Sequence, residues 1–250
     1  MDQLKLFLMN NPFFSIVVIC LNEEDTISNT ISSVLIQSFK DYEIIVKDGL
    51  SNDSTLQKIP SDSRIKVFKQ KDNGIYDAMN QAIHYCSGEY IFFLNCGDAF
   101  YNKDVLKNIH NRIPKDLVCC FYGDYYDSST SKLVEQNYEL CDYFWFRTTL
   151  CHQSVFFKKE CFKKYLFDAS YKIAADFVLM FHLYYSGVPF IHEPLAVSKY
   201  DRLGVSSTNK GRKTNKKEKR AFLRDKFSFK KRVTYMFKAL LSKLTKNRKY

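Results

Sequence analysis

Two short segments of the chain combine carboxylates, amides and glycine, which is far more chemistry than a turn requires and indicates a ligand-binding site. The apolar run 90–94 leads directly into Asn95-Cys96-Gly97-Asp98, which predicts a buried strand followed by a turn with a free acid. Open α/β sheets bind ligands at that carboxyl edge of their strands. Residues 71–80 place further acids, amides and a glycine around the start of a predicted helix.

The elements that must position these groups alternate along the first half of the chain. Apolar runs predict strands, and residues at helical spacing predict helices between them. Alternation of this kind favours an α/β fold with a mainly parallel sheet, right-handed crossovers and flanking helices. The side chains of Asn22, Asp48, Asp77 and Asp98 then gather at one end of the sheet. The predicted strands are 14–20, 42–46, 65–68, 90–94 and 117–122, and the helical stripes are Ile27, Ile31, Val34, Leu35 and Ile75, Met79, Ala82, Ile83.

Charge divides the 250 residues into two parts. Residues 1–207 carry 21 basic and 25 acidic groups, and residues 208–250 carry 17 Lys and Arg against Glu218 and Asp225. We therefore predict one folded domain over 1–207 and a basic tail over 208–250. A protein that reads nucleic acid would spread positive charge over its folded face, so this segregation favours a tail that anchors the protein to a surface.

The tail has two sections. Residues 210–217 are too hydrophilic to fold alone and predict a linker. Beyond them, apolar residues recur at helical spacing between Lys and Arg, which is typical of an interfacial helix on anionic lipid. A helix packed on the body with a solvated basic face is the alternative. The apolar residues are Phe229, Val233, Met236, Phe237, Leu240, Leu241 and Leu244.

The eight cysteines include no Cys-x-x-Cys pair and no zinc spacing, which predicts reduced, buried thiols in a cytosolic protein. The segment Met1 to Met9 has a short apolar stretch but lacks a basic leader and a small-residue cleavage site. No other run reaches the length of a membrane span. We expect neither secretion nor a transmembrane helix.

Four segments, taken in order, resemble the inverting glycosyltransferases of family 2, which have the GT-A fold, and in particular the bacterial branch that builds capsule, O-antigen or colanic-acid-type polysaccharide. The resemblance covers residues 13–207. Segments 20–24 and 46–55 are similar to the family's two nucleotide-contacting segments, and 71–80 and 93–98 complete its donor site. The nucleotide-sugar-binding residues that the resemblance implies here are Cys20, Asn22, Glu24, Asp48, Gly74, Asp77, Asn80, Asn95 and Asp98.

The chemistry of such an enzyme is the departure of a nucleoside diphosphate from an anomeric carbon, which concentrates negative charge on the phosphates. A Mn²⁺ or Mg²⁺ ion can bridge a carboxylate to both phosphates, and Asp98 is its first candidate ligand. Asp48 resembles the acid that binds the base. The alternatives are that Asp48 holds its own turn and that Asp98 caps the helix beginning near Asp104.

The acceptor hydroxyl needs a general base, and a carboxylate in a partly desolvated cleft suffices. Asp176 precedes an apolar helix at a place similar to that of the family's catalytic acid, although a helix N-cap would have the same position. His152 and Gln153 lie in a segment that looks like the one lining the cleft. Residues 204–207 resemble a loop that closes over the donor, or equally a surface loop.

Three positions depart from the common family pattern. Asn95 stands where an Asp is usual, in a motif of four residues instead of three; Lys47 replaces the first acid of a pair; and Ala175 stands where Glu would precede Asp176. We interpret these changes as the signature of one branch of the family.

The leading hypothesis is a cytoplasmic enzyme, peripheral on the inner face of the plasma membrane. It transfers a sugar from a nucleotide donor, with UDP-sugar favoured, to a lipid-linked glycan with inversion. A sugar-nucleotide nucleotidyltransferase is the enzyme alternative, but the first strand lacks a Gly-rich basic loop, and a dinucleotide-dependent oxidoreductase lacks its glycine fingerprint. Nucleic-acid binding by the tail would leave the acid-lined sheet edge unexplained, so we expect no nucleic-acid partner. Exposed aromatic residues would support a homodimer.

Overall fold

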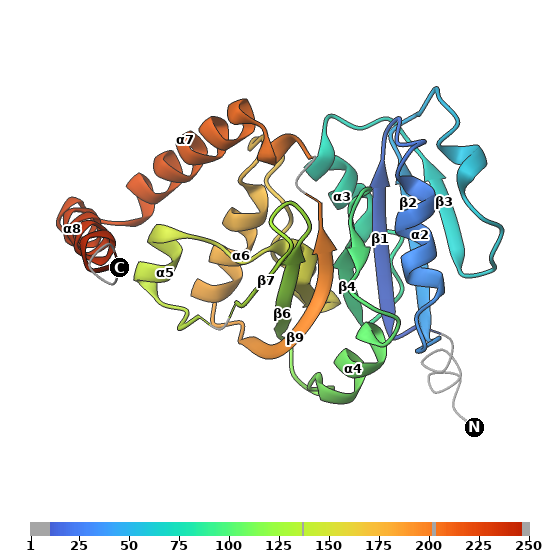
Figure 1. Ribbon diagram of the computed structural model, residues 1–250, viewed down its shortest axis with the longest axis horizontal. Helices are drawn as coiled ribbons and strands as arrows, with labels where there is room; N and C mark the ends of the chain where they lie inside the picture. The colour runs from blue at the N-terminus through green and yellow to red at the C-terminus, as the bar shows by residue number, and fades with distance from the viewer. Residues whose placement is uncertain (1–10, 137, 202–203, 247–250) are drawn as a thin grey trace.

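The computed structural model describes residues 11–136, 138–201 and 204–246 of the chain (Figure 1). The stretch Met1 to Met9 lies outside the described residues. All eight cysteines lie within them, and none forms a disulfide there. The strands are β1 (Phe14–Cys20), β2 (Tyr42–Asp48), β3 (Ile65–Lys69), β4 (Tyr90–Phe93), β5 (Ala99–Phe100), β6 (Cys120–Asp127), β7 (Lys132–Val134), β8 (Val155–Lys158) and β9 (Phe190–Tyr200).

The described strands form one sheet in the order β3-β2-β1-β4-β8-β6-β9-β5, with β7 paired to β6. The pairs among β3, β2, β1 and β4 are parallel, as the alternation predicts. In the second half, β8 is antiparallel to β4 and β6, and β5 is antiparallel to β9, while β6 and β9 are parallel. The sheet is therefore mixed beyond β4. Antiparallel neighbours need no long crossover helix between them, so the strand and helix alternation of the first half does not continue there.

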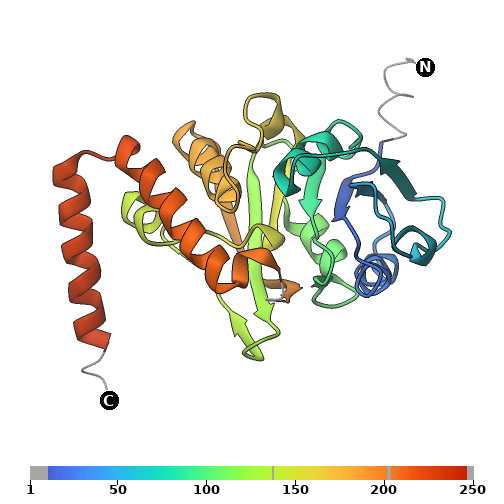
Figure 2. The same cartoon turned by 90° about the horizontal axis from the view of Figure 1, so that it is seen from above.

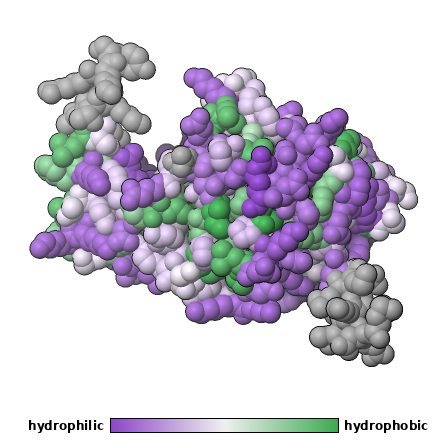
Figure 3. All heavy atoms as spheres, turned by 90° about the horizontal axis from the view of Figure 1, so that it is seen from below, coloured by the Kyte–Doolittle hydropathy of each residue, from purple (hydrophilic) through white to green (hydrophobic). Residues whose placement is uncertain are grey.

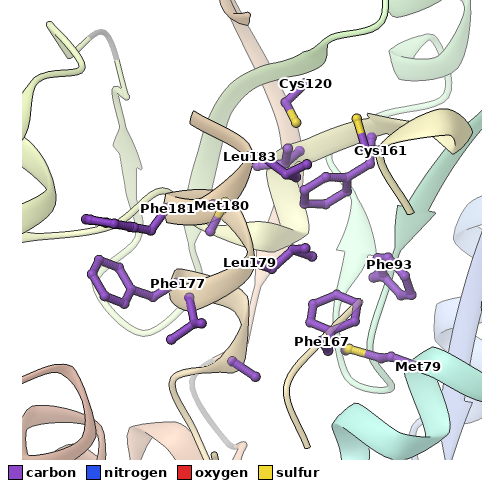
Figure 4. Packing of buried hydrophobic residues seen from close by; sticks show 14 of the residues in the cluster. Met79, Phe93, Cys120, Cys161, Phe167, Phe177, Leu179, Met180, Phe181 and Leu183 are labelled. Carbon is purple, nitrogen blue, oxygen red and sulfur yellow. The ribbon is translucent and has the colours of Figure 1, made fainter. Parts of the chain in front are cut away.

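Helices cover both faces of the sheet. Along β1, Ile16 and Val18 point to the cluster that contains α2 and α4, and Val17 points to the cluster that contains α3 and α6. Figure 4 shows the second cluster, in which Phe167 lies beside Met79 and Phe93. The helices are α2 (Ile27–Leu35), α3 (Ile75–Ile83), α4 (Val105–Arg112), α5 (Asp142–Arg147), α6 (Ala175–Tyr185), α7 (Asn209–Lys226) and α8 (Phe229–Lys246), with 3₁₀ turns η1 (Leu56–Lys58), η2 (His152–Ser154), η3 (Lys159–Lys163) and η4 (Val205–Ser207).

Two sequence predictions of local structure need correction. The alternation of strands and helices predicts a helix between β2 and β3, but the polar turn after β2 leads only into η1, a single short 3₁₀ turn. The strand predicted over 117–122 begins three residues later, and Leu117 and Val118 are exposed. Their apolar character predicted a strand, but the pairing of this segment with β8 begins only at Cys120.

The expected linker is helical. Residues 209–226 form α7, which begins where the Thr208 hydroxyl accepts a hydrogen bond from the amide of Gly211 at 2.9 Å. Phe222 and Leu223 are buried in the same cluster as α6. Tertiary packing of one apolar face stabilises a helix that its composition alone does not support, which is why the prediction of a linker was wrong.

Helix α8 packs on the body along one side only. Lys231 forms an ion pair with Asp142 of α5, and the ring of Tyr235 contacts Phe146. Its apolar residues are largely exposed, and Figure 2 shows the helix standing at the end of the molecule far from β3. Figure 3 shows hydrophobic residues on this part of the surface beside hydrophilic ones. Among the described residues, no helix is both long and apolar enough to cross a membrane.

A buried carboxylate stabilises the amino-terminal ends of the parallel strands β1 and β2. Glu43 of β2 is 3% exposed and accepts hydrogen bonds from the Ser15 hydroxyl (2.6 Å), the Ser87 amide (2.6 Å) and Lys66 Nζ (2.7 Å). Burial alone would raise the pKa of Glu43, but the bonds from Lys66, Ser15 and Ser87 lower it below its ordinary value. Because the folded pKa is the lower one, Glu43 stabilises the fold above the unfolded pKa and loses this effect as the pH falls.

We predict that Glu43→Gln lowers the free energy of unfolding by about 1–3 kcal/mol at pH 7, because buried donors lose their charged acceptor. The deficit should shrink as the pH falls below the ordinary glutamate pKa of 4.5. Urea denaturation over a pH series measures both. Glu89→Gln is the control, since the Glu89 side chain in its ion pair with Lys158 is 51% exposed. A deficit that does not change with pH would contradict this account.

Candidate functional site

The loops after β1 and β2 are joined by reciprocal hydrogen bonds. The amide of Asn22 donates to the Ser51 hydroxyl, and the amide of Asn52 donates to Asn22 Oδ1, both at 2.9 Å. Asn22 has a φ of 55°, a region that Asn adopts more readily than most residues. The Asn22 side chain thus holds the two loops together.

A second reciprocal pair involves Glu24. Its carboxylate accepts a hydrogen bond from the amide of Ser54 at 3.1 Å, and its own amide donates to Asp53 at 3.2 Å. The amide of Glu23 donates to the Thr55 hydroxyl at 2.7 Å. The loops expected to hold the nucleotide therefore form one rigid unit.

Asp48 lies at the end of β2 and is fully buried. Its Oδ2 accepts hydrogen bonds from the amides of Leu50 and Ser51, both at 3.0 Å, and Cys20 Sγ lies 3.7 Å from its Oδ1. Burial, together with the Asp48 charge, raises the pKa of the Cys20 thiol to about 12. In this structure Asp48 holds its own turn, and its contact with a base stays a prediction.

Lys47, near the end of β2, contacts the loop that follows β3. The side chain is fully buried, and its Nζ lies 2.7 Å from Asp72 Oδ2 and 2.6 Å from the carbonyl oxygen of Gln70. A Cβ added at Gly49 would lie 2.8 Å from the same Asp72 oxygen, so a side chain there would displace the Asp72 carboxylate. The lysine that replaces a family acid thus has a structural partner.

The start of α3 is built from the expected acid and glycine. Gly74 has a φ of 124° and donates its amide to Asp72 Oδ1 at 3.2 Å. Asp77 accepts a hydrogen bond from the amide of Asn73 at 2.8 Å. Asp77 therefore stabilises the first turn of the helix, where a negative charge is favourable.

Two side chains of α3 hold the segment that leads to α6. Asn80 Nδ2 donates to the carbonyl oxygen of Phe167 at 2.8 Å, and the Phe167 amide donates to Asn80 Oδ1 at 3.0 Å. The Tyr76 hydroxyl donates to the carbonyl oxygen of Ile173. Asn80 therefore positions the chain next to the site.

Asp98 lies where three segments meet beyond the end of β4. It is 3% exposed, its Oδ1 accepts a hydrogen bond from the Asp201 amide at 2.8 Å, and its Oδ2 accepts one from Gln153 Nε2 at 3.2 Å. Burial raises the pKa of Asp98 to about 7, against the lowering effect of the Asp201 amide and His152. Helix α4 has Asp104 as its own N-cap, so Asp98 does not cap it.

Asn95, His152 and Asp176 form a chain of contacts beside Asp98. Asn95 Nδ2 lies 3.4 Å from His152 Nε2, and His152 Nδ1 lies 3.2 Å from Asp176 Oδ2. The carboxylate favours a proton on His152 Nδ1. Ala174 is the N-cap of α6, so Asp176 stands in the first turn and not at the cap.

The charge state of Asp176 follows from its neighbours. Burial alone would raise its pKa, but the hydrogen bond and charge of His152 and the charge of Lys219 lower it below the ordinary aspartate value. The side chain is 17% exposed. Asp176 is therefore a carboxylate at neutral pH and is accessible to a second molecule.

The tail helix supplies a group that sequence reasoning missed. Glu218 of α7 accepts hydrogen bonds from the amides of Lys172, Ile173 and Ala174 at 2.8, 3.0 and 3.0 Å. These amides immediately precede α6, so α7 fixes the start of the helix that carries Asp176. Glu218 is one of two acids in the basic tail. An acid among so many basic residues was the sequence feature that could have identified it.

The structure thus brings Asn95, Asp98, His152, Gln153 and Asp176 into one connected cluster. The other predicted residues lie on neighbouring segments: Cys20 and Asp48 end β1 and β2, Asn22 and Glu24 lie in the loop after β1, Gly74 is the N-cap of α3, and Asp77 and Asn80 lie in α3. The segment expected to close over the donor is the 3₁₀ turn η4.

The cluster contains oxygen atoms suited to a hard divalent ion. Among the described residues, no three His, Cys, Asp or Glu side chains are arranged to hold a metal by themselves. Asn95 Oδ1 is buried and makes no hydrogen bond to any described residue, and Asp98 is the neighbouring carboxylate. This set fits Mg²⁺ or Mn²⁺, which commonly use one or two carboxylates and complete their shell with substrate phosphates and water.

Comparison with known proteins gives a family match and two kinds of relatives. A family model described as "Glycosyl transferase family 2" matches residues 15–186. The chain is 28% identical over 211 residues to the PGL/p-HBAD biosynthesis glycosyltransferase of Mycobacterium bovis, covering 80% of this chain and 78% of that protein. It is 34% identical over 129 residues to the UDP-Glc:alpha-D-GlcNAc-diphosphoundecaprenol beta-1,3-glucosyltransferase WfgD of Escherichia coli, covering 50% of this chain and 51% of that protein.

Solved structures share the fold at low identity. S. aureus TarS 1-349 in complex with UDP aligns with a TM-score of 0.59 and 20% identity, covering 75% of this chain and 60% of that chain. The mannosyltransferase PcManGT from Pyrobaculum calidifontis, in complex with GDP-Man and Mn²⁺, aligns with a TM-score of 0.60 and 15% identity, covering 76% and 57%. The chain thus spans less than two thirds of these two solved chains.

We predict that Lys47→Met costs about 3–5 kcal/mol of unfolding free energy, because it leaves Asp72 without its cation in a mostly buried place. The double variant Lys47→Met/Asp72→Asn should regain part of this loss, since it removes the unpaired charge. Chemical denaturation of the two single variants and the double variant gives the coupling energy. Additive losses would show that the pair does not hold the loops together.

Proposed function

Because the chain belongs to glycosyl transferase family 2 and has the GT-A fold, we propose that it transfers a sugar from a nucleoside diphosphate sugar to a hydroxyl of a lipid-linked oligosaccharide in surface polysaccharide biosynthesis. UDP-sugar is the favoured donor. The names of WfgD and of the TarS complex with UDP support the choice of uridine nucleotide and of a diphosphate-linked lipid acceptor. Membership of this family argues against the nucleotidyltransferase and oxidoreductase alternatives. A homodimer stays a prediction.

The observation that carries this proposal is the connected cluster from Asp98 to Asp176. Asp98 follows β4, the strand that pairs with β1, whose loop is hydrogen-bonded to the loop after β2. Asp176 stands in the first turn of α6. His152 contacts Asp176 on one side and Asn95 on the other. A donor bound beside Asp98 and an acceptor bound beside Asp176 would meet at this cluster.

In the proposed reaction, Asp176 removes the proton from the acceptor hydroxyl as the oxygen attacks the anomeric carbon. The bond between that carbon and the diphosphate oxygen breaks, and attack from the opposite face inverts the centre. His152 acts as a positioning residue, because its Nδ1 holds one oxygen of Asp176 and favours the charged form. A divalent ion held by Asp98 and Asn95 would supply positive charge to the departing diphosphate.

We predict that the chain binds UDP more tightly than GDP and that binding requires Mn²⁺ or Mg²⁺. Asp98→Ala should weaken metal-dependent UDP binding about 10–100-fold or more, because the ion loses its carboxylate. Isothermal titration calorimetry measures this effect, and Asp116→Ala removes an exposed acid as the control. Failure of the wild-type chain to bind either nucleotide, with or without metal, would sink the proposed function.

Asp176→Asn should lower kcat about 10²–10⁴-fold because the base is lost, while the Kd for UDP stays unchanged. His152→Ala removes a group that lowers the pKa of Asp176, so the acid side of the pH–rate profile should move to higher pH. His84→Ala, at an exposed histidine, is the control. Full activity in Asp176→Asn would remove Asp176 from the mechanism.

We also propose that α8 attaches the enzyme to the cytoplasmic face of the plasma membrane. Phe237 and Leu240 are 65% and 55% exposed, and lysines lie near them along the helix. An apolar stripe flanked by cations suits a surface of anionic lipid. The soluble end of a lipid-linked acceptor would then lie close to the enzyme.

The membrane proposal predicts that the full chain cosediments with vesicles containing anionic lipid and much less with neutral vesicles. Phe237→Glu/Leu240→Glu should reduce binding at least about tenfold, because each side chain loses 1.5–3 kcal/mol or so of burial. Leu117→Glu/Leu166→Glu changes two exposed leucines elsewhere and is the control. Equal loss in both double variants would argue against a role specific to α8.

A further inference from the structure

A groove of about 1340 Å³ lies between α7 and α8. Of the 17 described residues that line it, nine are Lys or Arg and none is acidic. The cations come mainly from α7, and Phe229, Val233 and Met236 of α8 form the apolar side. A ligand that fits both sides has a strongly anionic group next to an apolar chain.

Two residues that line the groove each carry a buried polar atom with no hydrogen-bond partner in the described part of the chain. Arg232 Nε and Asn215 Oδ1 are buried, and neither makes a hydrogen bond to any described residue. An unpaired buried donor or acceptor is costly, and a ligand that pairs with it recovers this cost. A phosphate oxygen would accept from Arg232 Nε, and a sugar hydroxyl would donate to Asn215 Oδ1.

The groove is connected to the candidate site through Lys219. This side chain lines the groove, and its Nζ lies 4.6 Å from the centre of the Phe177 ring, one residue after Asp176. The preceding residue, Glu218, binds the three amides before α6. A phosphate held in the groove would therefore place its attached sugar near Asp176.

The groove and the membrane-facing stripe use different parts of α8. Phe237, Leu240 and Leu241 are 51–65% exposed and do not line the groove. Phe237 and Leu240 can meet a flat lipid surface, whereas the concave groove suits a single molecule. The charge and the shape together favour one amphiphilic ligand over the membrane surface itself.

We propose that the α7–α8 groove binds the lipid end of the acceptor, with its diphosphate against the cations of α7 and the first part of its apolar chain against α8. This inference rests on the proposed function, because it assigns a place to the lipid-linked acceptor. Arg232 and Arg220 bind the diphosphate, and Lys219 marks the side from which the sugar approaches Asp176. The groove is separate from the nucleotide loops after β1 and β2.

The test is calorimetric titration of the full chain with farnesyl diphosphate, inorganic diphosphate and farnesol. Farnesyl diphosphate should bind at least about tenfold more tightly than either fragment, because it alone meets both sides of the groove. Arg220→Ala/Arg232→Ala should weaken its binding about tenfold or more. Lys107→Ala/Lys230→Ala removes two exposed cations outside the groove and should leave binding unchanged.

The outcomes separate the possible failures. Equal binding of inorganic and farnesyl diphosphate would show a simple phosphate site and overturn the inference, as would equal loss in the two double variants. Displacement of farnesyl diphosphate by a single-stranded oligonucleotide at the same phosphate concentration would identify a nucleic-acid groove instead, and also overturn it. Met236→Glu should selectively weaken the farnesyl ligand, which tests the apolar side even where the double variant unfolds. The Mn²⁺-dependent titration with UDP is independent of the groove, so its failure counts against the proposed function alone.

Discussion

The hydrogen bond between His152 and Asp176 is the contact on which the site depends. It joins η2, which leads into β8, to the first turn of α6, and through Asn95 it reaches the end of β4. Without it, Asp176 would be a partly buried acid whose pKa rises and whose carboxylate is not oriented. In the proposed reaction the parallel half of the sheet would supply the donor side and the mixed half the acceptor side, and this contact links the two halves.

The tail belongs to the same construction. Glu218 caps the amides before α6, Phe222 packs against the rings of Phe177 and Phe181, and Lys219 adds positive charge near Asp176. The position of Asp176 therefore depends on α7, which in turn forms one side of the basic groove. A boundary at residue 207 separates charge along the sequence, but it does not separate the tail from the structure of the site.

Much of the fold was predictable because strand and helix periodicity are local signals. The range of β1 agrees with the prediction, and Ile27, Ile31 and Val34 of α2 are buried as their spacing indicates. Long-range contacts were not predictable in this way. No residue pattern near Lys47 predicts its ion pair with Asp72. The hydrophilic composition at the start of α7 likewise does not indicate that Phe222 is buried. The motifs located Asp98, His152 and Asp176, yet only the fold shows that His152 contacts Asp176 and that Asp48 is used in its own turn.

The most direct test of the central claim is a crystal structure of the full chain with UDP and Mn²⁺. We expect the ion between Asp98 and the diphosphate, the base beside the loops after β1 and β2, and the diphosphate facing Asp176. Nucleotide and ion bound elsewhere, with Asp98 still held only by Gln153 and the Asp201 amide, would contradict the assignment of this cluster as the catalytic site.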